Sequence, residues 1–396
     1  MDTINQIYNI GFSGSIILGN DMGLKQADSD RLKHFLDGIK TRTENFLGYP
    51  VSKDFDFKEL FEFLKYPLNN LGDPFTPSTW KVDSREFERE VIDFMATLFR
   101  AGDDDYWGYV TNGGSEGNLY GLYLARELHP KGVVYYSQDT HYSVSKNLHL
   151  LNMRHIMIRS QANGEMDYAD LQETLRIHRD KPAIIFANIG TTMTEAKDDL
   201  LKIKTILKKL VISEHYIHSD AALCGGLAPF MKPRAAFDFK DGADSISVSG
   251  HKSFGSPIPC GILVAKKNNV SRIARSIAYI GSLDTTITGS RNGVTPLFLW
   301  YTIKKMGLEG LKKRVDYALN MAEYTERRLK DAGVDAWRNQ NAITVVFPEV
   351  AEAVREKWQL ATAQGRTHLI CMPNVQKEQI DKFLDDLKKI KKTDKL

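Results

Sequence analysis

The sequence is poor in cysteine, with three among 396 residues. Cys224, Cys260 and Cys371 lie far apart, and no two of them have the CxxC spacing of metal ligands. A small, odd and dispersed set argues against a disulfide framework and against a zinc site. We therefore expect neither a structural metal nor stabilising disulfides.

Long apolar runs and a strong charge of one sign are also missing. No stretch approaches the length needed to span a bilayer, and the first twenty residues lack a basic, apolar leader. Lysine and arginine total 53 against 50 acidic residues, and the excess is spread thinly. These features predict a cytoplasmic protein that binds neither membrane nor nucleic acid.

The apolar content of 42% is enough for one substantial core that carries a smaller domain. Most of the first hundred residues show apolar residues at three- and four-residue steps, which predicts helices. From Trp107 onward, short β-rich runs alternate with amphipathic helical stretches. The predicted strands are Val133–Ser137, His155–Arg159, Ala183–Asn188, Tyr216–His218, Ser245–Ser249 and Gly261–Ala265.

Repeated strand–helix–strand units predict an α/β fold with a mainly parallel sheet, whose ligands bind at the carboxyl ends of the strands. After Arg291, long helical segments lead to two strand-like runs, "NAITVVFP" and "THLICMP". We expect an N-terminal helical segment over 1–60, a large ligand-binding domain over 61–290 and a small α+β domain over 291–396.

A glycine pair marks the first candidate site. Gly113 and Gly114 precede Ser115 and a helical pattern. Glycine lets the backbone approach a ligand, and a helix N-terminus offers unpaired N–H groups, so a phosphate fits there. Ser115 would cap the helix and bond the phosphate. A plain helix cap explains the same residues, so this cluster alone leaves both interpretations open.

Two polar residues follow later strands. The imidazole of His141, after Val133–Ser137, can stack on an aromatic cofactor ring, although a hydrogen-bonded turn histidine is equally ordinary. Asp220 ends the run "YIHSD", where its carboxylate could pair with a protonated pyridine nitrogen or simply cap the next segment. Small Ala221 and Ala222 leave room for a flat ring.

A lysine follows the strand Ser245–Ser249. Lys252 precedes a loop rich in glycine and proline, "GSPIPCG". A charged ammonium is costly to bury unless it reacts or pairs, and a Schiff-base role supplies that reason. A surface lysine is the alternative.

The four clusters follow the chain order of phosphate loop, stacking histidine, pyridine aspartate and Schiff-base lysine. With the strings "WGYVTNGGSEGN", "YYSQDTHYSV", "FANIGTT", "HSDAAL", "SVSGHKSFGSPIPCG", "TITGSRNG" and "AWRNQNAITVVFP", the sequence resembles the group II pyridoxal-phosphate (PLP) decarboxylases of fold-type I. Within that group it is similar to the histidine and serine decarboxylases. The resemblance extends from about residue 45 to the end.

The resemblance implies an aspartate-aminotransferase-like fold, PLP as cofactor, and a homodimer with shared active sites. It implies that Lys252 forms the Schiff base, that Asp220 pairs with the ring nitrogen, and that His141 stacks on the ring. The remaining implied contacts are Ala222 on the opposite ring face, Gly114, Ser115, Ser249 and His251 at the phosphate, and Thr191 near the 3′ oxygen or Asp220.

The resemblance also implies roles for three further residues, one of which has an alternative interpretation. His218 would support Asp220, or is a core histidine. Ser290 and Arg291 would reach the cofactor of a neighbouring subunit.

Some positions depart from the subgroup's pattern. Val294 stands where a histidine is usual after "SRNG", Glu195 replaces a glycine in "GTTxxGA", and Leu283 replaces a charged or imidazole side chain. These departures bear on the substrate and leave the cofactor set intact. The predicted reaction is α-decarboxylation of a small polar L-amino acid, L-histidine first, with L-serine as the alternative because "NNLGDPF" resembles the serine enzymes.

Two rival functions remain. An aminotransferase, lyase or desulfurase would share the cofactor set, but a histidine directly before the lysine and a stacking histidine favour decarboxylation. A non-catalytic PLP-binding relative is disfavoured because no member of the cofactor set is substituted. Release of carbon dioxide rather than a keto acid separates the first pair.

Overall fold

The computed structural model describes residues 23–273, 275–277 and 282–393, without the side chains of 275–277, 282–283 and 390–393. The chain divides into two compact units, Met1–Asn45 and Phe46–Leu396, which are described separately. Among the described residues, no helix combines the length and the apolar composition needed to cross a membrane. The boundaries predicted at residues 60 and 290 stay a proposal.

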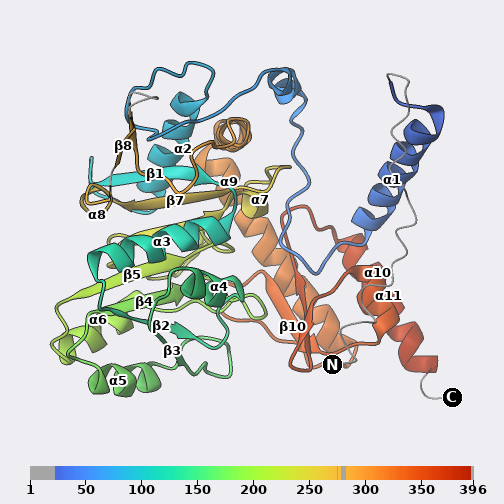
Figure 1. Ribbon diagram of the computed structural model, residues 1–396. Coiled ribbons are helices and arrows are strands. Elements are labelled where there is room, and N and C mark those ends of the chain that lie inside the picture. Colours follow the sequence, from blue (N-terminus) through green and yellow to red (C-terminus); the bar gives the residue numbers. More distant parts are fainter. Residues whose placement is uncertain (1–22, 274, 278–281, 394–396) are drawn as a thin grey trace, which may run out of the picture. The chain divides into compact units, whose positions relative to one another are not determined.

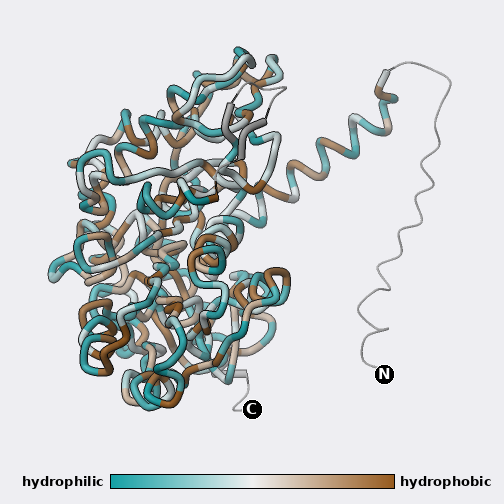
Figure 2. Tube along the Cα trace, turned by 60° about the vertical axis from the view of Figure 1, so that its left-hand side comes forward, coloured by the Kyte–Doolittle hydropathy of each residue, from teal (hydrophilic) through white to brown (hydrophobic). Residues whose placement is uncertain are grey.

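The first unit contains helix α1 (Gln26–Glu44), none of whose residues is buried. Apolar and polar residues alternate along its tube in Figure 2. Leu32, Phe35, Leu36 and Ile39 recur at three- and four-residue steps and form one apolar stripe, with exposed fractions from 39% to 59%. Among the described residues of the unit, none covers this stripe.

The second unit is built around a seven-stranded sheet in the order β1-β7-β6-β5-β4-β2-β3 (Figure 1). All its strands run parallel except β7, which is antiparallel to both β1 and β6. The strands are β1 (Tyr106–Thr111), β2 (Val133–Ser137), β3 (His155–Ile158), β4 (Ala183–Asn188), β5 (His215–Asp220), β6 (Ser245–Ser249) and β7 (Gly261–Lys266). The predicted α/β fold with a mainly parallel sheet is confirmed.

The reversed strand β7 was not predicted, and its direction follows from chain length. A parallel crossover needs a dozen or more residues, usually with a helix. Between β6 and β7 the chain has only the short helix α7 (Gly250–Ser253) and residues 254–260. Strand β7 therefore pairs with β6 in the antiparallel direction.

Two hydrophobic cores cover the two faces of the sheet because side chains alternate along each strand. Ile185 and Ile217 belong to one core, whereas their neighbours Ile184 and Tyr216 belong to the other. The helices of this part are α2 (Arg85–Leu98), α3 (Gly114–Leu128), α4 (Ser143–Leu150), α5 (Tyr168–Ile177), α6 (Leu200–Lys209) and α8 (Lys267–Val270), with 3₁₀ turns at Lys58–Lys65 and Ala228–Phe230.

The C-terminal part is α+β, as predicted. Its three-stranded antiparallel sheet has the order β10-β12-β11. The elements are α9 (Thr295–Asp331), interrupted at Gly307, β10 (Thr344–Pro348), α10 (Glu352–Trp358), β11 (Thr362–Ala363), β12 (Arg366–Ile370) and α11 (Lys377–Thr393). Before it, β8 (Arg275–Ile277) pairs with β9 (Ser282–Asp284).

Candidate active site

The predicted site residues gather where the parallel strands end. Asp220 is the last residue of β5, Lys252 lies in α7 directly after β6, and His141 lies between β2 and α4. The charges of Asp220 and Lys252 each shift the pKa of the other, and both shift the pKa of His141. These three side chains therefore share one electrostatic environment.

Asp220 is a buried carboxylate held by two donors. Its residue is 7% exposed. Oδ1 accepts a hydrogen bond from the Ala222 N–H at 3.1 Å, and Oδ2 accepts one from the Asn118 amide at 2.9 Å. Burial raises the pKa of Asp220, whereas the Ala222 N–H, the Lys252 charge and the Asn118 amide lower it. The position suits a cationic partner, which would stabilise the ionised form.

Lys252 has the surroundings of a reactive amine. Burial lowers its pKa, and the nearby Asp220 carboxylate partly offsets that effect. A lowered pKa increases the fraction of neutral, nucleophilic amine. Its backbone carbonyl accepts a hydrogen bond from the Ser52 N–H at 3.3 Å, which anchors the turn. The interpretation as an ordinary surface lysine does not fit this burial.

His141 presents a fixed ring. Its Nδ1 lies 2.8 Å from the Ser143 hydroxyl at the start of α4. Burial lowers the pKa of His141. Its ring also packs at a tilt on Tyr142, with centroids 4.3 Å apart. A neutral imidazole in a fixed orientation is suited to stacking on another flat ring.

The glycine cluster brings three chain segments together. A Cβ atom on Gly114 would lie 2.6 Å from the Ser249 hydroxyl and 3.1 Å from Cβ of Ala222. Only glycine allows this approach between the start of α3, the end of β6 and the turn after β5. The first N–H groups of α3 have no intrahelical acceptor, so an anion can bind there.

One detail of the predicted phosphate loop is wrong. Gly113 is the N-cap of α3 and Gly114 is the first helical residue, so Ser115 lies within the first turn and does not cap the helix. Gly113 has a φ of +153°, which a serine at that position would adopt only with strain. Ser115 itself is exposed, and its contact with a phosphate stays a prediction.

Two other predicted residues are anchored through their own loops. Nδ1 of His251 lies 2.9 Å from the Cys260 carbonyl, which leaves Nε2 as the atom able to meet a ligand. The Thr191 hydroxyl lies 2.9 Å from that of Thr194 and accepts from the Ala196 N–H at 2.9 Å. The contact of Thr191 with a cofactor stays a prediction.

Sequence reasoning missed Asn118. This residue lies one turn into α3 and connects Asp220 to His218, because its Oδ1 lies 3.0 Å from Nε2 of His218. His218 therefore supports Asp220 through Asn118 and not by direct contact. The available signal was the spacing of Asn118 four residues after Gly114, which places both on one face of the helix.

Arg291 is bound within its own chain. Its guanidinium forms a buried ion pair with Glu88 and donates to the Gly72 carbonyl at 3.0 Å, and the residue is 4% exposed. These contacts occupy the side chain within its own chain, and its predicted approach to the cofactor of a neighbouring subunit stays a prediction. Ser290 is exposed and accepts a hydrogen bond from Asn69.

The unusual Glu195 has a structural explanation. Its φ is +54°, in the left-handed region that favours the glycine expected there. Its fully buried carboxylate accepts hydrogen bonds from the N–H groups of Ile343 and Thr344, both at 2.9 Å, and lies 3.3 Å from Nζ of Lys197. These bonds offset a backbone cost of about 1–2 kcal/mol and connect the turn after β4 to β10.

The other two departures contribute less. Val294 packs with Phe57, Leu60 and Phe298 in a small hydrophobic cluster, which gives its apolar side chain a role in packing. The sequence places the expected substrate contacts in the loop after Ile280. Ile280 itself and the side chain of Leu283 lie outside the described residues.

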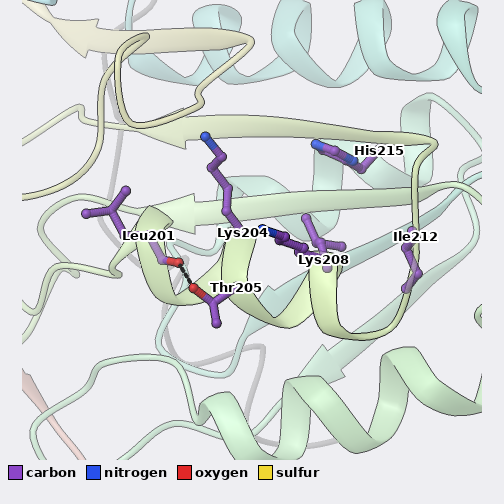
Figure 3. Close-up of a pocket in the computed structure, with 7 residues that line it drawn as sticks. Leu201, Lys204, Thr205, Lys208, Ile212 and His215 are labelled. Atoms are coloured by element: carbon purple, nitrogen blue, oxygen red, sulfur yellow. Dashed lines mark hydrogen bonds between the residues drawn. The ribbon is translucent and has the colours of Figure 1, made fainter.

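A surface hollow of about 390 Å³ lies elsewhere, between α6 and the start of β5 (Figure 3). Leu201, Lys204, Lys208, Ile212 and His215 line it. His215 begins β5 and Asp220 ends it, so His215 places the hollow toward the amino ends of the parallel strands, away from Lys252 at their carboxyl ends. It contains none of the converging residues.

The converging residues fit a flat cofactor that carries a phosphate. Asp220 can face a ring cation, Lys252 offers an amine, and the close approach of Gly114 to Ser249 and Ala222 brings three chain segments together at the start of α3. The N–H groups at the start of α3 suit the phosphate. The donor set is thus consistent with PLP.

Burial of neutral His218 predicts acid sensitivity. Burial lowers the pKa of His218 from 6.5 to about 3. Between those values the unfolded chain binds a proton that the folded chain does not, so the free energy of unfolding falls as pH falls. In the cofactor-free protein, His218→Phe should flatten this slope between about pH 6.5 and 4.5. The same change at exposed His149 should leave it unaltered, and equal slopes for wild type and His218→Phe would contradict the expectation.

Comparison with known proteins identifies related sequences. A family model described as the pyridoxal-dependent decarboxylase conserved domain matches residues 83–347. A histidine decarboxylase of Mesorhizobium japonicum is 51% identical over 364 residues, covering 92% of this chain and 98% of that protein. A histidine decarboxylase of Morganella morganii is 48% identical, covering 86% of this chain and 91% of that protein.

Solved structures share the fold. An L-methionine decarboxylase from Streptomyces sp.590, in complex with L-methionine methyl ester, superposes with a TM-score of 0.85 at 25% identity, covering 92% of this chain and 95% of that one. A glutamate decarboxylase of Lactobacillus brevis gives a TM-score of 0.77 at 17% identity, covering 95% of this chain and 94% of that one.

Proposed function

The chain belongs to the pyridoxal-dependent decarboxylases, and from this premise we propose that it converts L-histidine to histamine and carbon dioxide. The observation that carries the reaction is the convergence of Lys252, Asp220 and His141 at the carboxyl edge of the sheet. The substrate is supported by the high identity to proteins named histidine decarboxylase over nearly the whole chain.

When bound, PLP supplies an electron sink for the electron pair that remains at Cα when the carboxylate leaves. The side chains of this protein prepare that chemistry. Lys252 would hold the cofactor through its amine, at the position that the substrate amine would occupy. Asp220 would hold a proton on the ring nitrogen by staying ionised, and charge stabilisation of this kind is a large part of catalysis.

The other residues orient the cofactor. His141 would stack on one ring face and Ala222 would pack on the other. Gly114, Ser115, Ser249 and His251 would hold the phosphate, and Thr191 would lie near the 3′ oxygen or Asp220. These assignments are supported by the gathering of the segments around Gly114 and by the fixed ring of His141.

L-Serine remains the second candidate because the segment "NNLGDPF" resembles the serine decarboxylases. Buried polar groups in a pocket reject a substrate that leaves them unpaired, often by large factors. The two amino acids should therefore differ clearly. The experiment is a measurement of kcat/KM for carbon dioxide release by the PLP-loaded protein with histidine, serine, and acidic and aliphatic amino acids.

We expect histidine to give the highest kcat/KM, by about tenfold or more over serine. A higher value for serine would overturn the substrate while leaving the decarboxylase intact. Accumulation of a keto acid in place of carbon dioxide would instead favour an aminotransferase.

We further propose a homodimer with shared active sites. The uncovered apolar stripe of α1, formed by Leu32, Phe35, Leu36 and Ile39, supports a second copy as its partner. The native mass in solution checks this assembly, since a monomer would contradict it. The cytoplasmic location stays a prediction.

A further inference from the structure

A line of buried side chains extends from Asp220 into the interior of the sheet. Asn118 donates from Nδ2 to Asp220, and its Oδ1 lies 3.0 Å from Nε2 of His218. Nδ1 of His218 lies 2.7 Å from the Ser245 hydroxyl, which accepts a hydrogen bond from the Tyr216 hydroxyl at 2.9 Å. Asn118, His218, Ser245 and Tyr216 are each at most 2% exposed.

The chemistry of these groups gives this series of hydrogen bonds one donor-to-acceptor direction. The hydroxyl of Tyr216 donates to Ser245, so the single proton of Ser245 is available for Nδ1 of His218. A neutral imidazole then carries its proton on Nε2 and donates it to the Asn118 carbonyl oxygen. That bond turns the NH₂ group of Asn118 toward Asp220.

The opposite direction is incompatible with an ionised Asp220. If Nδ1 of His218 donated to Ser245, Nε2 would become an acceptor and would turn the NH₂ group of Asn118 toward itself. The carbonyl oxygen of Asn118 would then face Asp220, which could donate a hydrogen bond to it only as a protonated acid. The donation from Tyr216 to Ser245 and from Asn118 to Asp220 therefore favours the carboxylate.

Packing keeps the histidine ring in place. A Cβ atom on Gly121 would lie 2.2 Å from Nδ1 of His218, so a side chain at position 121 would displace the ring. On another side the ring contacts Phe186, with centroids 5.1 Å apart. The amide of Asn118 therefore meets a histidine that cannot turn away.

We propose that Asn118 and His218 are positioning residues that hold Asp220 ionised and directed at the cofactor's ring nitrogen. This inference rests on the proposed role of Asp220. Burial alone would favour the protonated acid, which cannot balance a ring cation. The series of hydrogen bonds through Asn118 directs a buried dipole at the carboxylate, and the low polarity of the interior strengthens each of these hydrogen bonds.

The test measures cofactor binding without substrate. Cofactor-free protein is titrated with PLP and with its 1-deaza analogue, in which a C–H group replaces the ring nitrogen. The ratio of the two dissociation constants reports the contact between Asp220 and that nitrogen. Wild type should prefer PLP, and Asn118→Ala and His218→Phe should each reduce that preference by about tenfold, the size expected for one charge-assisted hydrogen bond.

Tyr216→Phe is the matched control. It removes a buried hydrogen bond at the far end of the same line, but Ser245 can still donate to His218. The preference should stay within about threefold of wild type. A purely structural role would instead give all three variants similar losses of unfolding temperature with an unchanged preference for PLP.

A folded Asn118→Ala protein that retains the wild-type preference would overturn the proposal. If Asn118→Ala and His218→Phe fail to fold, Ser245→Ala decides, because it removes the donor to Nδ1; an unchanged preference in that variant also overturns it. Since no amino acid is present, failure of the histidine assignment would leave this ratio untouched.

Discussion

Replacement of Lys252 by alanine should abolish turnover and the absorbance of the Schiff base with PLP. The amine of Lys252 has a pKa lowered by burial and lies in the field of Asp220, as a nucleophile at this position requires. The loss should be at least about 10³-fold, since groups that act as a unit in covalent catalysis cost this much or more when removed. Steady-state carbon dioxide release and the visible spectrum measure both effects.

Lys266→Ala provides the control for this change. Lys266 is the last residue of β7, which is antiparallel to β6, so it lies near the amino ends of the parallel strands and far from Lys252 at their carboxyl ends. Its Nζ forms an ion pair with Asp244 at 2.8 Å. Its loss should leave turnover and spectrum near wild type. Full activity in Lys252→Ala would remove the proposed mechanism.

Asp220→Asn should reduce kcat by about 10²-fold or more while the protein still binds some PLP. A neutral amide cannot hold the proton on the ring nitrogen, so the electron sink weakens. Asn118 would also lose the carboxylate that accepts its hydrogen bond at 2.9 Å. Single-turnover rates and PLP content of the purified variant give the two quantities separately.

Asp198→Asn is the matched variant for Asp220→Asn. Asp198 is a buried carboxyl near the end of the adjacent strand, bonded to the N–H groups of Asn188 and Met166, and burial raises its pKa to about 7. Asp198→Asn shows whether an amide in place of a buried carboxyl group in this region is enough by itself to lower kcat. Near-normal rates in Asp220→Asn would mean that the aspartate only caps the segment after β5.

Local patterns predicted much of the fold. The predicted bounds of β2, β4 and β6 agree with the structure. Strands β2 and β4 are short, continuous apolar or aromatic runs that end in a polar residue, and β6 alternates serine with Ile246 and Val248. Strand β1 was missed: Gly108 interrupts its pattern, and its aromatic residues also occur in the loops nearby. The reversed direction of β7 depends on the length of a connection, which periodicity does not report.

The place of a candidate site residue was predictable where it follows directly from its own strand, as with Asp220 and Lys252. Contacts between distant segments were not. Asn118 and His218 are a hundred residues apart and meet only because α3 packs on β5. The burial of Arg291 against Glu88 likewise depends on a tertiary contact that no local motif encodes.

The most direct test follows the carboxyl carbon of the substrate. L-Histidine labelled in its carboxyl carbon is incubated with the PLP-loaded protein, and labelled carbon dioxide and histamine are counted together. We predict one equivalent of labelled carbon dioxide for each histamine formed, with no keto acid. A product that retains the label, or a keto acid in place of the amine, would contradict the assignment of this chain as a histidine decarboxylase.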